Sequence, residues 1–391
     1  MKRRAALTIC ATAASSLRTL GLTVVAARTL DADQFGTFSL LLISYVLVTG
    51  GARALLVEFH LSSGQYENGI SSIPHSFKIT APVAIAGLAI AFAADQPTAL
   101  LLIFVPGLVV YEQARTLEIG LGNAAIGLVV DSAWTSVTLL AAGLQATGYL
   151  SLEHTVVAWA ATPSVIGSLL SLWLHKSVRR STRPSTVEKR FSWAYLADYL
   201  IGSGSSQIAM LCIPIVTSPS VTGAIRGGGT VLNPLTQVAT AARPLLLATT
   251  GASLRADPQS AFRKNIKVTL TLTIALVAGA IIAAMLPDVV GQSLLGETWR
   301  SAQTVLFPLG LEIALSLIAQ VAFAAHRAAV RGGRIIIIRS TLAAVRVPSI
   351  LLVAAHAGQA EPVAWAMCGV AALSAATWWL SYFQINGTKV A

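Results

Sequence analysis

The chain has 391 residues, of which 55% are hydrophobic and only 11% are charged. Soluble domains carry about 25% charged residues, so a chain this poor in charge could not cover the surface of a soluble fold. A net charge of +11 would suggest nucleic-acid binding in a soluble protein, but Lys and Arg of membrane proteins gather at the cytoplasmic ends of spans. The composition therefore excludes a soluble catalytic domain and a nucleic-acid partner, and it predicts a polytopic membrane protein.

Apolar segments of membrane-spanning length follow one another along almost the whole chain. Six precede a basic stretch, at 5–27, 37–57, 79–95, 98–117, 124–147 and 154–175, and six follow it, at 193–217, 221–249, 267–287, 302–325, 335–356 and 362–384. We predict an all-α polytopic membrane protein with about twelve transmembrane helices in two six-helix lobes. The lobes are expected at 1–175 and 193–391, joined by a basic cytoplasmic linker at 176–192.

The distribution of positive charge predicts the topology. With the N-terminus inside, 21 of the 27 Lys and Arg residues fall in cytoplasmic segments, and only Arg28 and Arg300 fall in outer loops. This asymmetry favours an even number of spans with both termini in the cytoplasm.

Enzyme signatures are missing from the sequence. There is no Walker loop, no His-Glu-x-x-His and no Gly-x-Ser-x-Gly, the six His are scattered, and no outer loop is long enough to hold a sugar-transferring site. We predict that the chain is not an enzyme and holds neither a metal nor a cofactor. A proton or sodium gradient is left open as a driving force.

Arginines inside the predicted spans are the main candidates for function. A charge at the bilayer centre costs about 2.5–3.5 kcal/mol on insertion scales, so it normally faces a partner, the bundle interior or water. Four arginines occupy such positions, namely Arg18, Arg226, Arg243 and Arg346. A guanidinium stays protonated and binds phosphate or carboxylate with two hydrogen bonds, so a cavity lined by arginine favours an anionic substrate. Arg226 and Arg243 lie near span ends, where snorkelling to the interface is the alternative.

Acidic residues in spans are fewer. Glu312 lies deepest, and together with Asp198 it is a candidate either for an ion pair with an arginine or for coupling transport to a proton or sodium ion. Glu118 and Asp131 flank a presumed cytoplasmic turn, where simple solvation is expected. The run 227–229 of three glycines lacks the flanking strand and Lys-Ser/Thr of a phosphate loop, and it indicates close helix packing instead.

Three stretches resemble segments of one family. Residues 26–40, with the sequence AARTLDADQFGTFSL, are similar to the first outer loop of polysaccharide-lipid flippases (Wzx-like O-antigen and exopolysaccharide exporters), which share a superfamily with the MATE exporters. Residues 221–235 resemble the eighth span of that family, and residues 295–302 resemble the loop before its tenth span. Asp31 stands where the family usually has glycine, which affects the shape of the loop more than transport chemistry.

The resemblance implies a function. Such proteins form two six-helix lobes around a cationic central cavity and move an undecaprenyl-diphosphate-linked oligosaccharide by alternating access from the inner to the outer leaflet. Arg18 and Arg226 would bind the substrate, because the first and eighth spans line the cavity in that family. The location would be the bacterial cytoplasmic membrane, and the partners would be membrane lipids, the lipid-linked oligosaccharide and proteins of polysaccharide polymerisation and assembly.

Two alternatives stay open from the residues. One is a MATE-like, cation-coupled exporter of small molecules, which would need unpaired carboxylates inside the membrane. The excess of arginine over acid within the spans disfavours it. The other is a non-transporting scaffold of an envelope-assembly complex that has kept the fold.

Overall fold

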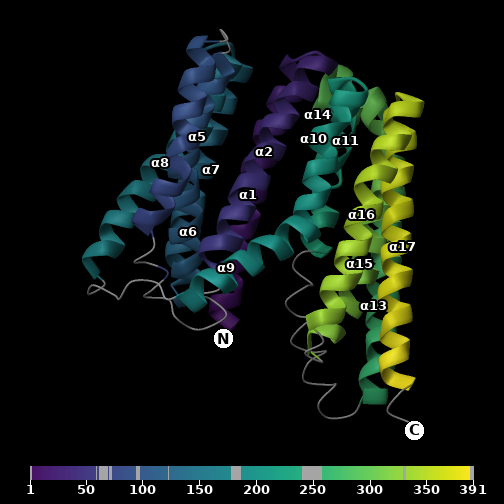
Figure 1. Ribbon diagram of the computed structural model, residues 1–391. Helices are drawn as coiled ribbons and strands as arrows, with labels where there is room; N and C mark the ends of the chain where they lie inside the picture. Colours follow the sequence, from purple (N-terminus) through teal and green to yellow (C-terminus); the bar gives the residue numbers. More distant parts are fainter. Residues whose placement is uncertain are drawn as a thin grey trace. The chain divides into compact units, whose positions relative to one another are not determined.

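The fold is all-helical. The computed structural model describes residues 2–58, 60, 69, 73–93, 97–121, 123–177, 186–239, 258–328 and 332–387, and within these residues it contains helices and no strand (Figure 1). The predicted fold class is therefore confirmed.

In the described part of the chain, each predicted span falls on one helix or on two or three consecutive helical segments. The first half of the chain contains α1 (Lys2–Thr29), α2 (Ala32–Leu56), α5 (Ile73–Ala93), the 3-10 helix η1 (Pro97–Phe104), α6 (Val105–Leu121), α7 (Ala124–Ala146) and α8 (Leu152–Ser177). The second half contains α9 (Thr186–Tyr199), the π-helix η2 (Leu200–Gly204), α10 (Ser205–Val216), α11 (Pro219–Val231), α13 (Pro258–Ala284), α14 (Asp288–Leu295), the 3-10 helix η3 (Gly296–Thr298), α15 (Trp299–Ala328), α16 (Gly332–Ala357) and α17 (Ala360–Gly387). The middle of the predicted linker and the end of the predicted span 221–249 lie outside the described residues.

Eight helical segments are long and apolar enough to cross a membrane, judged by length and composition over the described residues. They are Ala32–Leu56, Ala124–Ala146, Leu152–Trp173, Ser192–Val216, Asn265–Ala284, Asp288–His326, Gly333–Ala357 and Ala360–Gln384. The four other predicted spans fall on α1, α5, η1 with α6, and α11. The protein is a multi-pass membrane protein, and the number of twelve spans stays a prediction.

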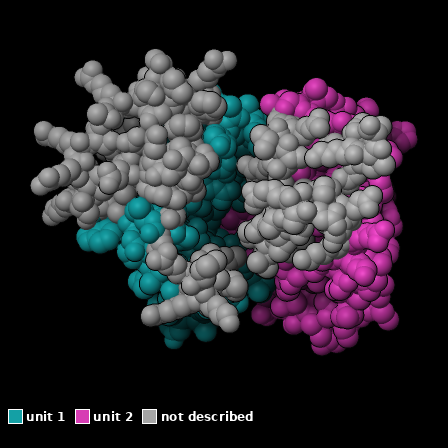
Figure 2. Space-filling view, turned by 90° about the horizontal axis from the view of Figure 1, so that it is seen from below, with its two compact units in different colours: residues 1–25, 44–200 teal, residues 26–43, 201–391 magenta. Residues whose placement is uncertain are grey.

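The chain divides into two compact units (Figure 2). Unit 1 comprises residues 1–25 and 44–200, and unit 2 comprises residues 26–43 and 201–391. These units differ from the predicted lobes in two segments. The hairpin 26–43, formed by the end of α1 and the start of α2, belongs to unit 2, and α9 belongs to unit 1.

Unit 1 is organised around α6, which packs against α5, α7 and α8. Small residues allow the close contact between α6 and α8. A Cβ atom added to Gly107 would overlap Ser164, and one added to Gly167 would meet the backbone of Tyr111. Helices with such small faces can approach closely without a loss of packing. A buried apolar cluster that includes Val109 and Leu117 fills the space beside this interface.

Unit 2 is organised around α15, which packs against α11, α13 and α17, while α16 packs against α10 and α17 (Figure 1). Two apolar clusters lie on either side of α15. One includes Leu342 and Trp378, and the other includes Leu276 and Val321. The indication of close helix packing at 227–229 is confirmed for Gly227 and Gly228, which face α15 at distances that leave little room for a side chain.

The three stretches that carry the family resemblance meet within unit 2. Asp33 Oδ1 accepts a hydrogen bond of 3.2 Å from the backbone N–H of Ser220, at the start of α11. A Cβ atom on Gly36 would overlap the backbone carbonyl of Pro219. Gly296 has a φ of +55°, which favours glycine, and it lies against the backbone of Ala27. The hairpin 26–43 therefore belongs to unit 2 because its backbone lies directly on that of α11 and on the turn before α15.

Candidate functional site

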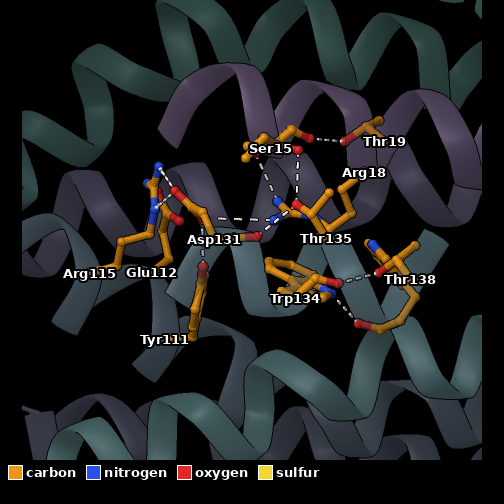
Figure 3. A network of polar contacts seen from close by, with 12 residues as sticks. Ser15, Arg18, Thr19, Tyr111, Glu112, Arg115, Asp131, Trp134, Thr135 and Thr138 are labelled. Carbon is orange, nitrogen blue, oxygen red and sulfur yellow. Dashed lines mark hydrogen bonds and ion pairs between the residues drawn. The ribbon is translucent and has the colours of Figure 1, made fainter. Parts of the chain in front are cut away.

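A network of buried charges lies inside unit 1, between α1, α6 and α7 (Figure 3). Its centre is Asp131 on α7, whose side chain is 1% exposed. Arg18 on α1 is 6% exposed and places Nη1 3.8 Å from Asp131 Oδ1. The guanidinium carbon of Arg18 lies 3.4 Å from the ring centroid of Trp134, and Nη2 donates a 2.9 Å hydrogen bond to Ser15.

Two residues of α6 complete the coordination of Asp131. The hydroxyl of Tyr111 donates to Oδ1 at 2.6 Å, and Arg115 donates to Oδ2 through Nε and Nη2, both at 2.7 Å. Arg115 also lies 3.6 Å from Glu112, one turn earlier on the same helix. Both carboxylate oxygens of Asp131 therefore accept hydrogen bonds, which is the arrangement that makes a buried charge tolerable.

The predicted solvation of Asp131 and Glu118 is wrong. Asp131 and Glu118 are each only 1% exposed. Asp131 is bound as above, and Glu118 accepts a 2.7 Å hydrogen bond from Asn123. The reason is that α7 already begins at Ala124, so Asp131 lies two turns inside a helix and on the face that meets α1 and α6.

Arg18, a predicted substrate-binding residue, is thus engaged within unit 1. Asp131 neutralises its charge and the ring of Trp134 covers its guanidinium, while Nε and Nη1 make no hydrogen bond within the described residues. A cation over an aromatic face gains about 0.5–2 kcal/mol, so this arrangement stabilises the charge even without a ligand. The predicted role of Arg18 in substrate binding stays a prediction.

Arg226 has a different environment, on α11 in unit 2. Its side chain forms no ion pair and no hydrogen bond with any residue that the structure describes, and its Nε atom is buried. Val221 and Thr222 on the same helix, and Gly227 beside it, are buried. Arg226 is therefore a half-buried cation in a predicted membrane span without an acidic partner in the described part of the chain.

Arg346 borders a cavity of about 270 Å³ inside unit 2, which we call the unit 2 cavity. It lies between α10, α15, α16 and α17 and begins at the π-helix η2. The Nη1 atom of Arg346 donates to Ser206 at 2.8 Å and lies 3.3 Å from Ser205 Oγ and 3.4 Å from the carbonyl oxygen of Gly202. These contacts hold one edge of the guanidinium against the start of α10 and leave the Nε and Nη2 donors without a partner among the described residues.

Glu312 lines the same cavity from α15. Its carboxylate makes no ion pair and no hydrogen bond within the residues that the structure describes. The predicted ion pair with an arginine is therefore not formed by Arg346 at contact distance, although both side chains line this cavity.

The remaining candidates, Asp198 and Arg243, are not among the residues that line this cavity. Asp198 is a half-buried residue of α9, in unit 1, whereas Glu312 belongs to unit 2. Arg243 lies outside the described residues. No group of three or more His, Cys, Asp or Glu side chains in the described part of the chain could hold a metal ion.

Sequence reasoning missed the residues that organise both sites. It did not single out Arg115, which binds Asp131, or Arg339, which lines the unit 2 cavity with its guanidinium carbon 4.4 Å from the ring centroid of Phe323. A signal existed for Asp131, since it lies inside the predicted span 124–147 and a charge there requires a partner.

Solved structures of MATE-family transporters share this fold. The inward-facing conformation of a multidrug resistance MATE family transporter of the MOP superfamily aligns with a TM-score of 0.69 and 14% identity over 96% of each chain. An outward-facing conformation of such a transporter gives 0.64 and 13% identity over 100% of this chain and 96% of the other. A MOP superfamily transporter from Pyrococcus furiosus, described as having a binding pocket of reverse polarity that suggests a different function, gives 0.61 and 13% identity over 98% of this chain and 94% of the other.

The sequence matches no protein-family model and no curated protein. At these identities the structural likeness establishes the fold. The chain has the MATE transporter fold with its two helical lobes.

Proposed function

We propose that the protein is a membrane transporter that works by alternating access and flips an anionic lipid-linked oligosaccharide, of the undecaprenyl-diphosphate type, from the inner to the outer leaflet. The fold supports the transport part, because the chain is similar over nearly its whole length to solved transporters in inward-facing and outward-facing conformations. We also propose that this step serves the export of a cell-surface polysaccharide across the bacterial cytoplasmic membrane. The partners would be proteins of polysaccharide polymerisation and assembly.

The observation that carries the choice of substrate is the unpartnered guanidinium of Arg226. A cation inside a membrane span is disfavoured by about 2.5–3.5 kcal/mol unless a partner or water meets it, and no described acidic residue does so. A diphosphate would supply acceptors for the free donors, and hydrogen bonds between charged groups contribute about 1.5–3 kcal/mol. The free donors of Arg346 add a second cationic group of the same kind.

A solved member of the superfamily makes such a substrate reasonable. The Pyrococcus furiosus transporter is described as having a binding pocket of reverse polarity and, by that, a different function. One fold can host several chemistries, because substrate choice depends on the side chains in the site.

A second candidate is supported by Glu312. An exporter of cationic small molecules needs an unpaired carboxylate inside the membrane, and Glu312 is such a group within the described residues. Several of the solved structures with this fold are multidrug resistance transporters. The excess of arginine over acid in the predicted spans favours the flippase.

The test is flipping of a fluorescent undecaprenyl-diphosphate oligosaccharide in vesicles that contain the purified protein, compared with the Arg226→Gln variant. We expect the variant to slow flipping by roughly ten- to a hundredfold, because it removes one charge-assisted contact to the diphosphate. Arg300→Gln is the matched control, since Arg300 is an exposed arginine at the start of α15. Normal flipping by Arg226→Gln would contradict the proposed role of Arg226.

A further inference from the structure

Several polar side chains that line the unit 2 cavity make no side-chain hydrogen bond with the residues that the structure describes. Besides Glu312, they are Ser203, Gln207, Ser316, Gln320 and Ser374. They come from η2, α10, α15 and α17, so four elements direct unused hydrogen-bonding groups at one space. Ser203 is exposed and Gln207, Ser316 and Gln320 are half-buried, so these side chains line an open cavity, where the hydroxyl groups of a ligand can replace water as hydrogen-bond partners.

The charges of the cavity are suited to one negative group. Arg346 is fixed by Ser206 along one edge and keeps its Nε and Nη2 donors for a ligand. Arg339 contributes a second positive charge at the wall. A carboxylate fits the two-donor edge of a guanidinium. Two arginines and one glutamate leave one positive charge in excess in this cavity, which a single carboxylate balances and a diphosphate exceeds. The Glu312 carboxylate accepts hydrogen bonds from hydroxyl groups.

Size and surface agree with a single sugar unit. Ligand cavities of drug size have volumes of about 300–1,000 Å³, so a cavity of about 270 Å³ lies at the small end of that range. The rings of Phe323 and Trp378 form part of its wall. Aromatic rings bind the apolar faces of larger molecules while neighbouring polar groups fix their orientation.

We infer that the unit 2 cavity binds one acidic sugar unit, with its carboxylate on Arg346 and its hydroxyl groups on Glu312 and the neighbouring serine and glutamine side chains. This inference rests on the proposed function and names the chemistry of the glycan that would be transported. Two sites then bind different parts of the substrate: the cavity binds the sugar, and Arg226 binds the diphosphate.

Binding of two matched probes to the purified full-length protein tests the inference. Methyl β-glucuronide and methyl β-glucoside differ only in the carboxylate, and their affinities can be compared by isothermal titration calorimetry. We expect the glucuronide to bind about tenfold or more tightly, since the carboxylate adds a charge-assisted pair. Equal affinity for the two probes, or binding of neither, would overturn the inference.

Variants place the probe in the cavity. Arg346→Gln is expected to abolish the preference for the glucuronide, and Arg346→Lys is expected to reduce it, because lysine keeps the charge but loses the two-donor edge. Glu312→Gln should weaken binding of the glucoside, because the amide keeps only one acceptor oxygen, and should weaken binding of the glucuronide less, because it also removes a negative charge that repels the carboxylate. Arg300→Gln is the control and should keep the full preference. A preference that survives in a folded Arg346→Gln variant would overturn the assignment of the carboxylate.

The flipping assay separates failure of this inference from failure of the proposed function. Flipping of a lipid-linked neutral glycan, with no preference for the glucuronide, would overturn the inference and leave the proposed function standing. A glucuronide preference that depends on Arg346, in protein that flips no lipid-linked glycan, would support the cavity assignment and count against the flippase.

Discussion

Asp131 determines the arrangement of charge in unit 1. Its carboxylate contacts Arg18, Arg115 and Tyr111, and it is the acidic partner of Arg18, whereas Arg115 also lies 3.6 Å from Glu112. Burying an ion pair brings little net stability, but removing one member leaves an uncompensated charge in a medium of low dielectric constant. The network should therefore be sensitive to the loss of Asp131, the acid at its centre.

Replacement of Asp131 by alanine is expected to destabilise the protein by about 3–5 kcal/mol, because it leaves the buried guanidinium of Arg18 without its carboxylate and removes the closer of the two acidic partners of Arg115. The measurement is the midpoint of thermal unfolding of the purified protein in detergent. Glu153→Ala is the matched control, since Glu153 is an exposed carboxylate in the first turn of α8. Equal midpoints for Asp131→Ala and Glu153→Ala would show that the network does not support the fold.

The hairpin 26–43 packs closely against α11 and against the turn before α15. The three stretches that carry the resemblance to flippases all contribute backbone-to-backbone contacts here, through Gly36, Gly223 and Gly296. Their shared role is close packing rather than substrate chemistry. Only Arg226, which lies within the same part of α11, is a candidate for contact with the substrate.

Gly36→Ala is expected to destabilise the protein by about 1–3 kcal/mol, because the new Cβ atom would overlap the carbonyl of Pro219 and force the hairpin away from α11. Thermal unfolding in detergent measures the change. Gly229→Ala is the matched control, since nothing lies within 4 Å of an added Cβ atom there and alanine is preferred in a helix. A midpoint unchanged by Gly36→Ala would contradict the close approach of the two backbones.

The sequence predicts where the helices lie along the chain, but it does not predict which side of each helix packs against its neighbours. The spans 124–147 and 335–356 agree with α7 and α16 within a few residues, because runs of apolar residues of membrane length form helices in the absence of water. A hydropathy average over a window does not depend on the direction in which each side chain points around the helix. It therefore identified Arg18 and Arg346 as charges within spans but could not show that Asp131 meets the first or that Glu312 shares a cavity with the second.

The sequence predicts two lobes joined by a linker, and the two compact units divide the chain at other residues. The basic linker predicted a boundary at 176–192, whereas compactness separates the chain at 200–201, at the start of the π-helix η2. A π-helical turn departs from regular helical hydrogen bonding and carries no simple sequence pattern. The assignment of 26–43 to unit 2 depends on long-range backbone contacts at Gly36 and Gly296, which a pattern of hydropathy along the chain does not contain.

At the scale of the whole molecule, the MATE fold leaves two classes of cargo to decide between. The fold is shared with multidrug resistance transporters. The two buried acids differ in their partners. Asp131 forms ion pairs with arginine, whereas Glu312 forms no ion pair within the described residues. Arg226 forms no ion pair within the described residues, and this supports the proposal of an anionic cargo.

One measurement decides between the two cargoes most directly. Vesicles that contain the purified wild-type protein would be assayed in parallel for flipping of a fluorescent undecaprenyl-diphosphate oligosaccharide and for gradient-driven transport of the cationic dye ethidium. The account predicts protein-dependent flipping of the lipid-linked oligosaccharide and no transport of ethidium above that of empty vesicles. Transport of ethidium driven by a proton or sodium gradient, without flipping of the lipid, would contradict it and identify a cation exporter.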